Sequence, residues 1–232
     1  MRALVIVPAR LDARRLPGKP LAEIGGVPMV VRVARRASFL PGVRVVVASG
    51  DGPVLDVCSR AGVASVLTPR HVPSGTHRVG LAVEALGSPD VPIVNVQGDE
   101  PFVEPEHMDA ALRLIEGGAM IGTVAAPLRG DPENPDRVKV RFGEDGLAIA
   151  FSRQPLGHPE WQHLGLYAFS AGVLPQLLTL PETAGERAER LEQLRWLEHG
   201  HPIHVSPVRR SGLSVDTPDD LKAARQAVAS SL

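Results

Sequence analysis

The sequence predicts an α/β fold: a mostly parallel, doubly wound (Rossmann-like) sheet with helices on both faces and a β-rich insertion in the second half. Short apolar runs alternate with amphipathic stretches through the first half. This alternation is typical of parallel strands joined by right-handed helical crossovers. Several apolar runs are continuous, as in strands that are covered on both faces. After about residue 130 the helical spacing gives way to hairpin signals.

The first half alternates strands and helices in chain order. Residues 2–7 are rich in apolar, β-branched side chains and predict a buried strand. In residues 29–37 the apolar side chains recur at helical spacing with arginines opposite them, which indicates an amphipathic helix. The same patterns predict strands at 43–48, 63–67, 91–96 and 120–126, and helices at 54–61, 76–86 and 105–116.

The second half contains a different mixture of elements. Residues 138–142 and 147–151 flank a turn-rich segment and predict a hairpin. Further strands are expected at 164–169, 203–205 and 213–215, and helices at 171–178 and 186–198. Thr217, Pro218 and Asp220 have the spacing of an N-cap, a first-turn proline and a capping box, so they predict a last helix. We interpret residues 1–232 as one domain with a β-rich insertion at 130–165, and not as two independent domains.

Composition excludes several classes of protein. The chain has 232 residues, of which 44% are hydrophobic and 22% charged, with a formal net charge of −1. This composition excludes a disordered chain, and the lack of surplus Lys and Arg argues against a nucleic-acid partner. The single cysteine, Cys58, fits a reducing, cytoplasmic location. No apolar run approaches the ~20 residues of a transmembrane helix, so membrane insertion is not expected.

A cationic loop follows the first predicted strand. In open parallel sheets, ligands bind beyond the carboxyl ends of the strands. Residues 8–20 contain Arg10, Arg14, Arg15 and Lys19, together with prolines and a glycine that make the backbone irregular. Guanidinium and ammonium groups converging on one loop suit a polyphosphate. The alternative is a solvated basic surface loop, and at this stage both interpretations stand.

Two aspartates are candidates for a magnesium site. Asp99 follows the fourth predicted strand, and Asp216 follows the apolar pair Leu213 and Val215 at the end of a further one. Mg²⁺ binds to one or two protein carboxylates plus phosphate oxygens and water, so the two aspartates share a cation if their strand ends lie together. Alternatively, Asp99 or Glu100 caps the following helix, and Asp216 interacts with the N-terminus of the last helix.

Residues 74–76 precede a predicted helix. Free N–H groups at such a terminus suit an anionic or carbonyl-bearing ligand. Ser74 or Thr76 is alternatively the helix cap and nothing more.

A series of segments carries a resemblance that spans nearly the whole chain. The segments are Pro8-Ala9-Arg10, Arg15-Leu16-Pro17-Gly18-Lys19-Pro20, Ser74-Gly75-Thr76-x-Arg78, Asn95-Val96-Gln97-Gly98-Asp99-Glu100-Pro101, Val138-Lys139-Val140, Phe151-Ser152-Arg153, His163-Leu164-Gly165-Leu166-Tyr167, Leu191-Glu192-Gln193-Leu194-Arg195 and Val215-Asp216-Thr217-Pro218-x-Asp220-Leu221. In this order they resemble the CMP-Kdo synthetases (3-deoxy-manno-octulosonate cytidylyltransferases). The segment at 15–20 alone would indicate only the wider nucleotidyltransferase superfamily. The segments at 95–101 and 163–167 narrow the resemblance to the Kdo branch of that superfamily.

The resemblance implies a reaction and a set of roles. The anomeric hydroxyl of Kdo attacks the α-phosphate of CTP, and pyrophosphate leaves. The implied catalytic residues are Arg10, Lys19, Asp99 and Asp216, of which Asp99 and Asp216 bind Mg²⁺. The implied nucleotide-binding residues are Pro8, Ala9, Arg10, Arg15, Lys19, Ser74, Gly75, Arg78 and Gln97. The implied sugar-binding residues are Gln97, Arg153, His163, Tyr167, Glu192 and Gln193.

The resemblance also implies a homodimer in lipopolysaccharide-type glycan synthesis, with the 130–165 insertion on the sugar and dimer side of one nucleotidyltransferase domain. The segment 154–162 is shorter than the family's usual excursion. Two other functions stay open: a cytidylyltransferase for another acidic sugar, and a catalytically silent nucleotide-binding regulator. A silent regulator is expected to lose an acidic metal ligand or the lysine, but Lys19, Asp99 and Asp216 are all present.

Overall fold

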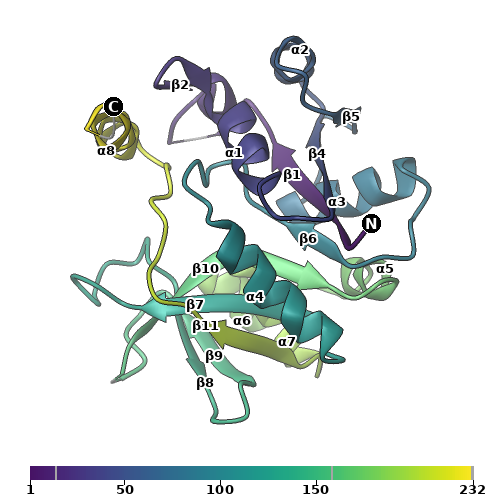
Figure 1. The fold of residues 1–232 in the computed structure, drawn as a ribbon. Coiled ribbons are helices and arrows are strands. Elements are labelled where there is room, and N and C mark those ends of the chain that lie inside the picture. Colours follow the sequence, from purple (N-terminus) through teal and green to yellow (C-terminus); the bar gives the residue numbers. More distant parts are fainter. Residues whose placement is uncertain (14, 158, 231–232) are drawn as a thin grey trace. The chain divides into compact units, whose positions relative to one another are not determined.

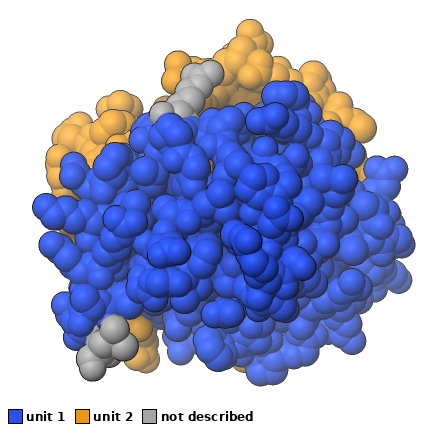
Figure 2. All heavy atoms as spheres, turned by 90° about the horizontal axis from the view of Figure 1, so that it is seen from above, with its two compact units in different colours: residues 1–106, 212–232 blue, residues 107–211 orange. Residues whose placement is uncertain are grey.

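The computed structural model describes residues 1–13, 15–157 and 159–230. This part of the chain forms two compact units, which we call unit 1 (residues 1–106 and 212–232) and unit 2 (residues 107–211); Figure 2 colours them blue and orange. Among the described residues, no helix combines the length and the apolar character that crossing a membrane requires.

Unit 1 is built on a parallel sheet whose strands run in the order β6, β1, β4, β5. The strands are β1 (Ala3–Ala9), β4 (Val43–Ser49), β5 (Ser65–Leu67) and β6 (Ile93–Asn95). Every residue of β1 is buried, as the continuous apolar run predicts for a strand covered on both faces. The carboxyl ends of these strands carry the loops of the candidate site.

Helices cover both faces of this sheet. They are α1 (Met29–Ala37), α2 (Gly52–Arg60) and α3 (Gly75–Ala85), and Figure 1 shows α1 in front of the strands and α3 behind them. The apolar residues of α1 are buried, while Arg35 is exposed, so the predicted amphipathic helix is confirmed. The α/β fold class is likewise confirmed.

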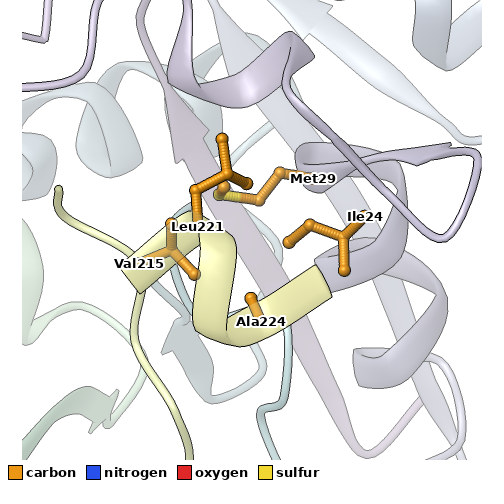
Figure 3. Close-up of a cluster of buried hydrophobic side chains, with 5 residues drawn as sticks. All are labelled: Ile24, Met29, Val215, Leu221 and Ala224. Carbon is orange, nitrogen blue, oxygen red and sulfur yellow. The ribbon is translucent and has the colours of Figure 1, made fainter. Parts of the chain in front are cut away.

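The rest of unit 1 joins its two sequence segments. It consists of η1 (Lys19–Leu21), the hairpin of β2 (Glu23–Ile24) and β3 (Val27–Pro28), and α8 (Pro218–Ala229). A buried cluster of Ile24, Met29, Val215, Leu221 and Ala224 packs α8 and the chain before it against the hairpin and α1 (Figure 3). The sequence analysis does not predict the hairpin, because two-residue strands carry no periodic signal.

Unit 2 pairs its strands mostly antiparallel. Its elements, with α4 beginning at the boundary, are α4 (Pro105–Glu116), β7 (Ile121–Pro127), β8 (Lys139–Phe142), β9 (Ala148–Ser152), β10 (Trp161–Phe169), α5 (Val173–Leu178), α6 (Ala184–Glu189), α7 (Glu192–Glu198) and β11 (Ile203–Pro207). The strand order is β11, β7, β10, β8, β9, and β11 and β7 are parallel. Strands β8 and β9 lie within the predicted 130–165 insertion, while the interpretation as a single domain stays a prediction.

Two predictions of secondary structure are wrong. The helix expected at 186–198 is two helices, because Arg190 adopts a left-handed conformation (φ 55°) that ends α6. The segment 213–215, expected as a strand, has no regular secondary structure. Its apolar side chains are used in the cluster of Figure 3 and not in a sheet.

Candidate active site

Lys19 joins the two aspartates that the sequence predicts as metal ligands. Its Nζ donates hydrogen bonds to Oδ2 of Asp99 at 2.7 Å and to Oδ1 of Asp216 at 3.0 Å. Burial alone lowers the pKa of the Lys19 ammonium, but its attraction to both carboxylates outweighs burial, and the pKa lies above its usual value. Two carboxylates that are far apart in the sequence therefore meet at one cation.

Asp216 is positioned by core packing next to it. Val215 is fully buried in the cluster of Figure 3, and its N–H donates a 2.9 Å hydrogen bond to the carbonyl of Asp99. The expectation that Asp216 ends a strand is wrong, since the chain before it is irregular. A buried side chain and one backbone hydrogen bond bring the aspartates together instead.

The start of α8 holds the main chain of Asp216. Thr217 and Asp220 form the predicted capping box, and Oδ2 of Asp220 also accepts a 3.1 Å hydrogen bond from the Asp216 N–H. Burial alone raises the pKa of Asp220, but the hydrogen bonds from Thr217 and from the two backbone N–H groups outweigh it and lower the pKa. The Asp216 carboxylate stays available to Lys19 and to Arg15, whose Nη2 lies 3.1 Å from Oδ2.

Glu100 adds a third carboxyl group next to the aspartates. Burial raises the pKa of Glu100 to about 8, and the charges of Asp99 and Asp216 add to this rise. Glu100 is therefore protonated more readily than an ordinary glutamate. Helix α4 begins only at Pro105, so the alternative in which Asp99 or Glu100 caps it is wrong.

A cavity of about 350 Å³ lies at this point and is lined by residues of unit 1. Its lining includes every residue predicted to bind the nucleotide: Pro8, Ala9, Arg10, Arg15, Lys19, Ser74, Gly75, Arg78 and Gln97. Asp99 and Asp216 line it as well. The cationic loop thus faces a cavity, which favours the polyphosphate interpretation over a solvated surface loop. Arg14 lies outside the described residues.

The N-terminus of α3 forms part of the cavity wall. Ser74 is the N-cap, because its Oγ accepts a 3.2 Å hydrogen bond from the His77 N–H. Ser74 and Gly75 both line the cavity. Ser74 therefore caps α3 and also lines the cavity, while ligand binding at this helix terminus stays a prediction.

Arg78 shapes the cavity through the loop that follows β5. Its side chain is buried, and its guanidinium donates hydrogen bonds to Thr68 Oγ1 at 2.5 Å and to the carbonyls of Pro69 and Arg70 at 3.0 Å each. Burial lowers the pKa of Arg78. Three of its hydrogen bonds are thus made with protein, and Arg78 fixes a wall of the cavity.

The loop after β6 approaches the carboxyl end of β1 closely. A Cβ on Gly98 would lie 2.7 Å from the carbonyl oxygen of Pro8, so that position admits only glycine without a shift of the backbone. Arg10 extends outward, with its side chain 60% exposed and its Nε 3.6 Å from Asp12. Gly98 and Pro8 therefore pack tightly in the cavity lining, and Arg10 is an exposed cation in the same lining.

The predicted sugar-binding residues divide between the units. Gln97 belongs to unit 1, and the others to unit 2: Arg153, His163, Tyr167, Glu192 and Gln193. In unit 2, His163 and Tyr167 lie on β10 with their rings 5.3 Å apart. The charge of Glu192 contributes to raising the pKa of Tyr167, after burial, so these two residues lie near each other. Arg153 instead donates to the carbonyls of Glu189 and Pro135.

His163 and Tyr167 are held neutral by burial. Burial lowers the pKa of His163 to about 3, and its Nε2 lies 3.0 Å from Thr123 Oγ1. Burial raises the pKa of Tyr167 well above its usual value. The Tyr167 hydroxyl has no hydrogen-bond partner among the described residues. A buried hydroxyl without a partner is costly, which suggests that a ligand or water satisfies it.

Sequence reasoning missed Asp51. Its carboxylate is buried and contacts both the cationic loop and the loop after β5. Asp51 follows the carboxyl end of β4, so the rule that ligands bind at such ends would have drawn attention to it. Asp51 lies outside the motifs that carry the family resemblance, so no motif pointed to it.

Comparison with known proteins relates this geometry to a family. A family model described as cytidylyltransferase matches residues 4–203. The chain is 43% identical to a 3-deoxy-manno-octulosonate cytidylyltransferase of Anaeromyxobacter sp. (strain Fw109-5), and the alignment covers 98% of this chain and 97% of that one. The chain belongs to the 3-deoxy-manno-octulosonate cytidylyltransferase family. A second cytidylyltransferase of that name, from Methylibium petroleiphilum, is 43% identical, with 97% of this chain and 94% of that one covered.

Solved structures agree with membership of this cytidylyltransferase family. A structure described as CMP:2-keto-3-deoxy-manno-octonic acid synthetase complexed with CTP matches with a TM-score of 0.92 and 33% identity, over 100% of both chains. A cytidylyltransferase from Leptospira borgpetersenii matches with a TM-score of 0.66 and 15% identity, over 100% of this chain and 88% of that one, and supports the fold alone. The family predicted from the sequence motifs is confirmed, and the protein is a nucleotidyltransferase enzyme.

Proposed function

We propose that this chain transfers CMP from CTP to the anomeric hydroxyl of 3-deoxy-D-manno-octulosonate (Kdo) and releases pyrophosphate. One observation carries the proposal: the Lys19 ammonium lies between Asp99 and Asp216 on the wall of a cavity that arginines also line. That arrangement suits a triphosphate and a divalent cation. The names of the relatives indicate CTP and the eight-carbon acidic sugar as the substrates.

The nucleotide is proposed to bind in the cavity of unit 1. Arg10, Arg15 and Lys19 contact the triphosphate, since guanidinium and ammonium groups neutralise phosphate charge. Ser74 and Gly75 line the wall formed by the start of α3, where backbone N–H groups suit polar atoms of the base and ribose. Pro8, Ala9, Arg78 and Gln97 complete the proposed set of nucleotide-binding residues.

Asp99 and Asp216 are proposed to hold Mg²⁺. Carboxylate oxygens are suitable ligands for this ion, and the two side chains already converge on one cation, Lys19. No group of three or more His, Cys, Asp or Glu side chains arranged for a metal ion occurs among the described residues. Phosphate oxygens and water would therefore complete the coordination. When bound, Mg²⁺ neutralises charge on the transferring phosphate.

The step itself is a substitution at phosphorus. The anomeric hydroxyl oxygen forms a bond to the α-phosphorus of CTP, the bond to the bridging oxygen breaks so that pyrophosphate leaves, and the hydroxyl proton passes to solvent water. With Mg²⁺ bound, Asp99 and Asp216 would be its ligands, and the Lys19 ammonium between them would be available to neutralise phosphate oxygens. Catalysis consists mainly of positioning and charge stabilisation, as in other phosphoryl-group transfers.

The sugar acid is proposed to be recognised by Gln97, Arg153, His163, Tyr167, Glu192 and Gln193. The unpartnered hydroxyl of Tyr167 supports a polar ligand close to it. The neutral ring of His163, held by Thr123, adds a directional hydrogen-bonding group. Together such groups suit the several hydroxyls of a sugar.

A pyrophosphate-release assay tests the proposed function. We expect release with CTP, Mg²⁺ and Kdo together, and background release when the sugar or the metal ion is omitted. A preference for N-acetylneuraminate over Kdo would assign the enzyme to another acidic sugar. Release that does not depend on any acidic sugar would contradict the proposal. A panel of CTP, UTP, ATP and GTP tests the choice of base.

The remaining expectations concern the cellular setting. We propose that the enzyme acts in the cytoplasm as a homodimer and supplies activated sugar for lipopolysaccharide-type glycans. The 130–165 segment is proposed to lie on the sugar and dimer side of a single nucleotidyltransferase domain. Light scattering coupled to size-exclusion chromatography tests the dimer, with a mass twice that of the 24.7 kDa chain expected.

A further inference from the structure

Asp51 occupies a helix cap position without capping the helix. It is the N-cap residue of α2, yet no side-chain cap hydrogen bond forms there among the described residues. An aspartate at this position ordinarily accepts a hydrogen bond from the first turn of its own helix. The side chain of Asp51 is nonetheless buried, with the residue 7% exposed. Its carboxylate is therefore used elsewhere.

Both oxygens of this carboxylate contact loops that border the nucleotide cavity. Oδ2 accepts a 2.9 Å hydrogen bond from the N–H of Leu11, the residue after Arg10 in the cationic loop. Oδ1 lies 3.3 Å from Nε of Arg70, in the loop that leads to Ser74 and Gly75. One buried charge thus ties together the loops after β1 and β5.

Leu11, which Asp51 binds, is in turn hydrogen-bonded to the residue before Lys19. The carbonyl of Leu11 accepts a 2.9 Å hydrogen bond from the N–H of Gly18, which closes the cationic loop. Gly18 adopts a left-handed conformation (φ 73°) and directly precedes Lys19. If Leu11 moved, the hydrogen bond from Gly18 would be disturbed, and the position of Lys19 would change with it.

The tie to Arg70 holds the opposite wall of the cavity. The carbonyl of Arg70 accepts a 3.0 Å hydrogen bond from the buried Arg78. A Cβ on Gly50 would lie 2.4 Å from Cα of Arg70, so the two backbones are packed together. Asp51 pairs with the Arg70 side chain, and Arg78 binds the Arg70 carbonyl. Both the side chain and the main chain of Arg70 are therefore held in this wall.

We infer that Asp51 is a positioning residue that sets the spacing between the phosphate-binding and base-binding walls of the CTP cavity. This inference rests on the proposed function. Asp51 does not line the cavity described above, so it acts through Leu11 and Arg70 and not by touching the nucleotide. Its effect should therefore concern CTP and not the sugar acid.

Three variants separate the two ties: Arg70→Ala, Asp51→Asn and Asp51→Ala. Arg70→Ala and Asp51→Asn should each raise KM for CTP about fivefold with kcat nearly unchanged, because asparagine still offers an oxygen to Leu11. Asp51→Ala loses the contacts with both Leu11 and Arg70. It should also raise KM for CTP and lower kcat about fivefold, because Lys19 is displaced. KM for the sugar should stay at the wild-type value in all three.

Asp109→Asn is the matched control, since the half-buried Asp109 pairs with the exposed Arg113 on α4 and does not line the cavity; it should leave both constants unchanged. CTP affinity measured calorimetrically without sugar checks the KM values. Arg70→Ala keeps the test informative if Asp51→Ala does not fold, because the Arg70 side chain is 70% exposed. The inference is overturned if the variants behave like the control, or if KM for the sugar rises as much as KM for CTP. A wild-type protein that fails to bind CTP overturns the proposed function itself.

Discussion

In unit 1 the ionisable groups of the candidate site pair with one another around a cavity, whereas in unit 2 the candidate groups His163 and Tyr167 are held neutral by burial. Lys19 has a raised pKa because two carboxylates surround it. His163 has a pKa lowered to about 3 because burial removes water from its ring. Paired charges suit an ionic ligand such as a polyphosphate, while neutral groups suit directional hydrogen bonds to hydroxyls. The following changes test this contrast, beginning with the largest expected effect.

Replacing Asp99 by asparagine should abolish most of the activity. We expect kcat to fall about 1,000-fold with the fold intact, because one of the two proposed metal-binding carboxylates loses its charge. Pyrophosphate release at saturating substrates measures the loss, and circular dichroism checks the fold. Asp109→Asn again serves as the control. Normal turnover in Asp99→Asn would remove Asp99 from the mechanism and weaken the contrast between the units.

Unit 2 also contains a buried ion pair, which should serve stability and not chemistry. Arg195 makes two 2.6 Å hydrogen bonds to Glu186, and both side chains are largely buried. Glu186→Gln leaves the buried guanidinium without its counter-charge and should lower the free energy of unfolding by about 3 kcal/mol. Urea denaturation measures this change. Glu182→Gln, in the exposed pair with Arg187, should change it by less than about 1 kcal/mol; equal losses would contradict the argument from burial.

Removing one hydroxyl should separate sugar binding from folding. Tyr167→Phe deletes an oxygen that has no partner among the described residues, so stability should not fall. KM for the sugar should rise about tenfold if the ligand satisfies that hydroxyl. KM for CTP is the internal control and should not change. An unchanged KM for the sugar would mean that the hydroxyl does not contact the sugar.

The smallest expected effect concerns the cap beside Asp216. Asp220→Ala should lower the free energy of unfolding by about 1 kcal/mol at pH 7, since the capping box is lost. The folded-state pKa of Asp220 is lowered, so its contribution is present above the unfolded pKa of about 3.9 and is lost as the pH falls through the folded value. The difference between variant and wild type should shrink below about pH 4. Asp219→Ala, in the same helical turn, is the control; an Asp220 effect that persists at pH 2 would contradict this origin.

The sequence predicts those parts of the molecule that depend on local patterns. The apolar run of β1, the amphipathic α1 and the capping box of α8 are each specified by neighbouring residues. The residues predicted to bind the nucleotide gather on one cavity because they lie at the carboxyl ends of parallel strands. The substrates, CTP and Kdo, were indicated by the resemblance of the sequence motifs to the family and not by these local patterns.

Features that depend on tertiary packing escaped prediction. The left-handed residue Arg190 divides a helix whose apolar spacing runs on without interruption. The apolar residues before Asp216 pack in a core cluster, although their pattern is that of a strand. Asp51 has the sequence position of a cap, and only the folded structure reveals that its carboxylate contacts Leu11 and Arg70. In the last two cases the partners lie far away in the sequence.

The placement of Asp216 has a consequence for biosynthesis. Lys19 and Asp216 are separated by 197 positions, and unit 1 takes its last segment from residues 212–232. The ribosome therefore makes the cationic loop long before it makes the second aspartate. A chain that ended before residue 216 would lack one of the two carboxylates that pair with Lys19.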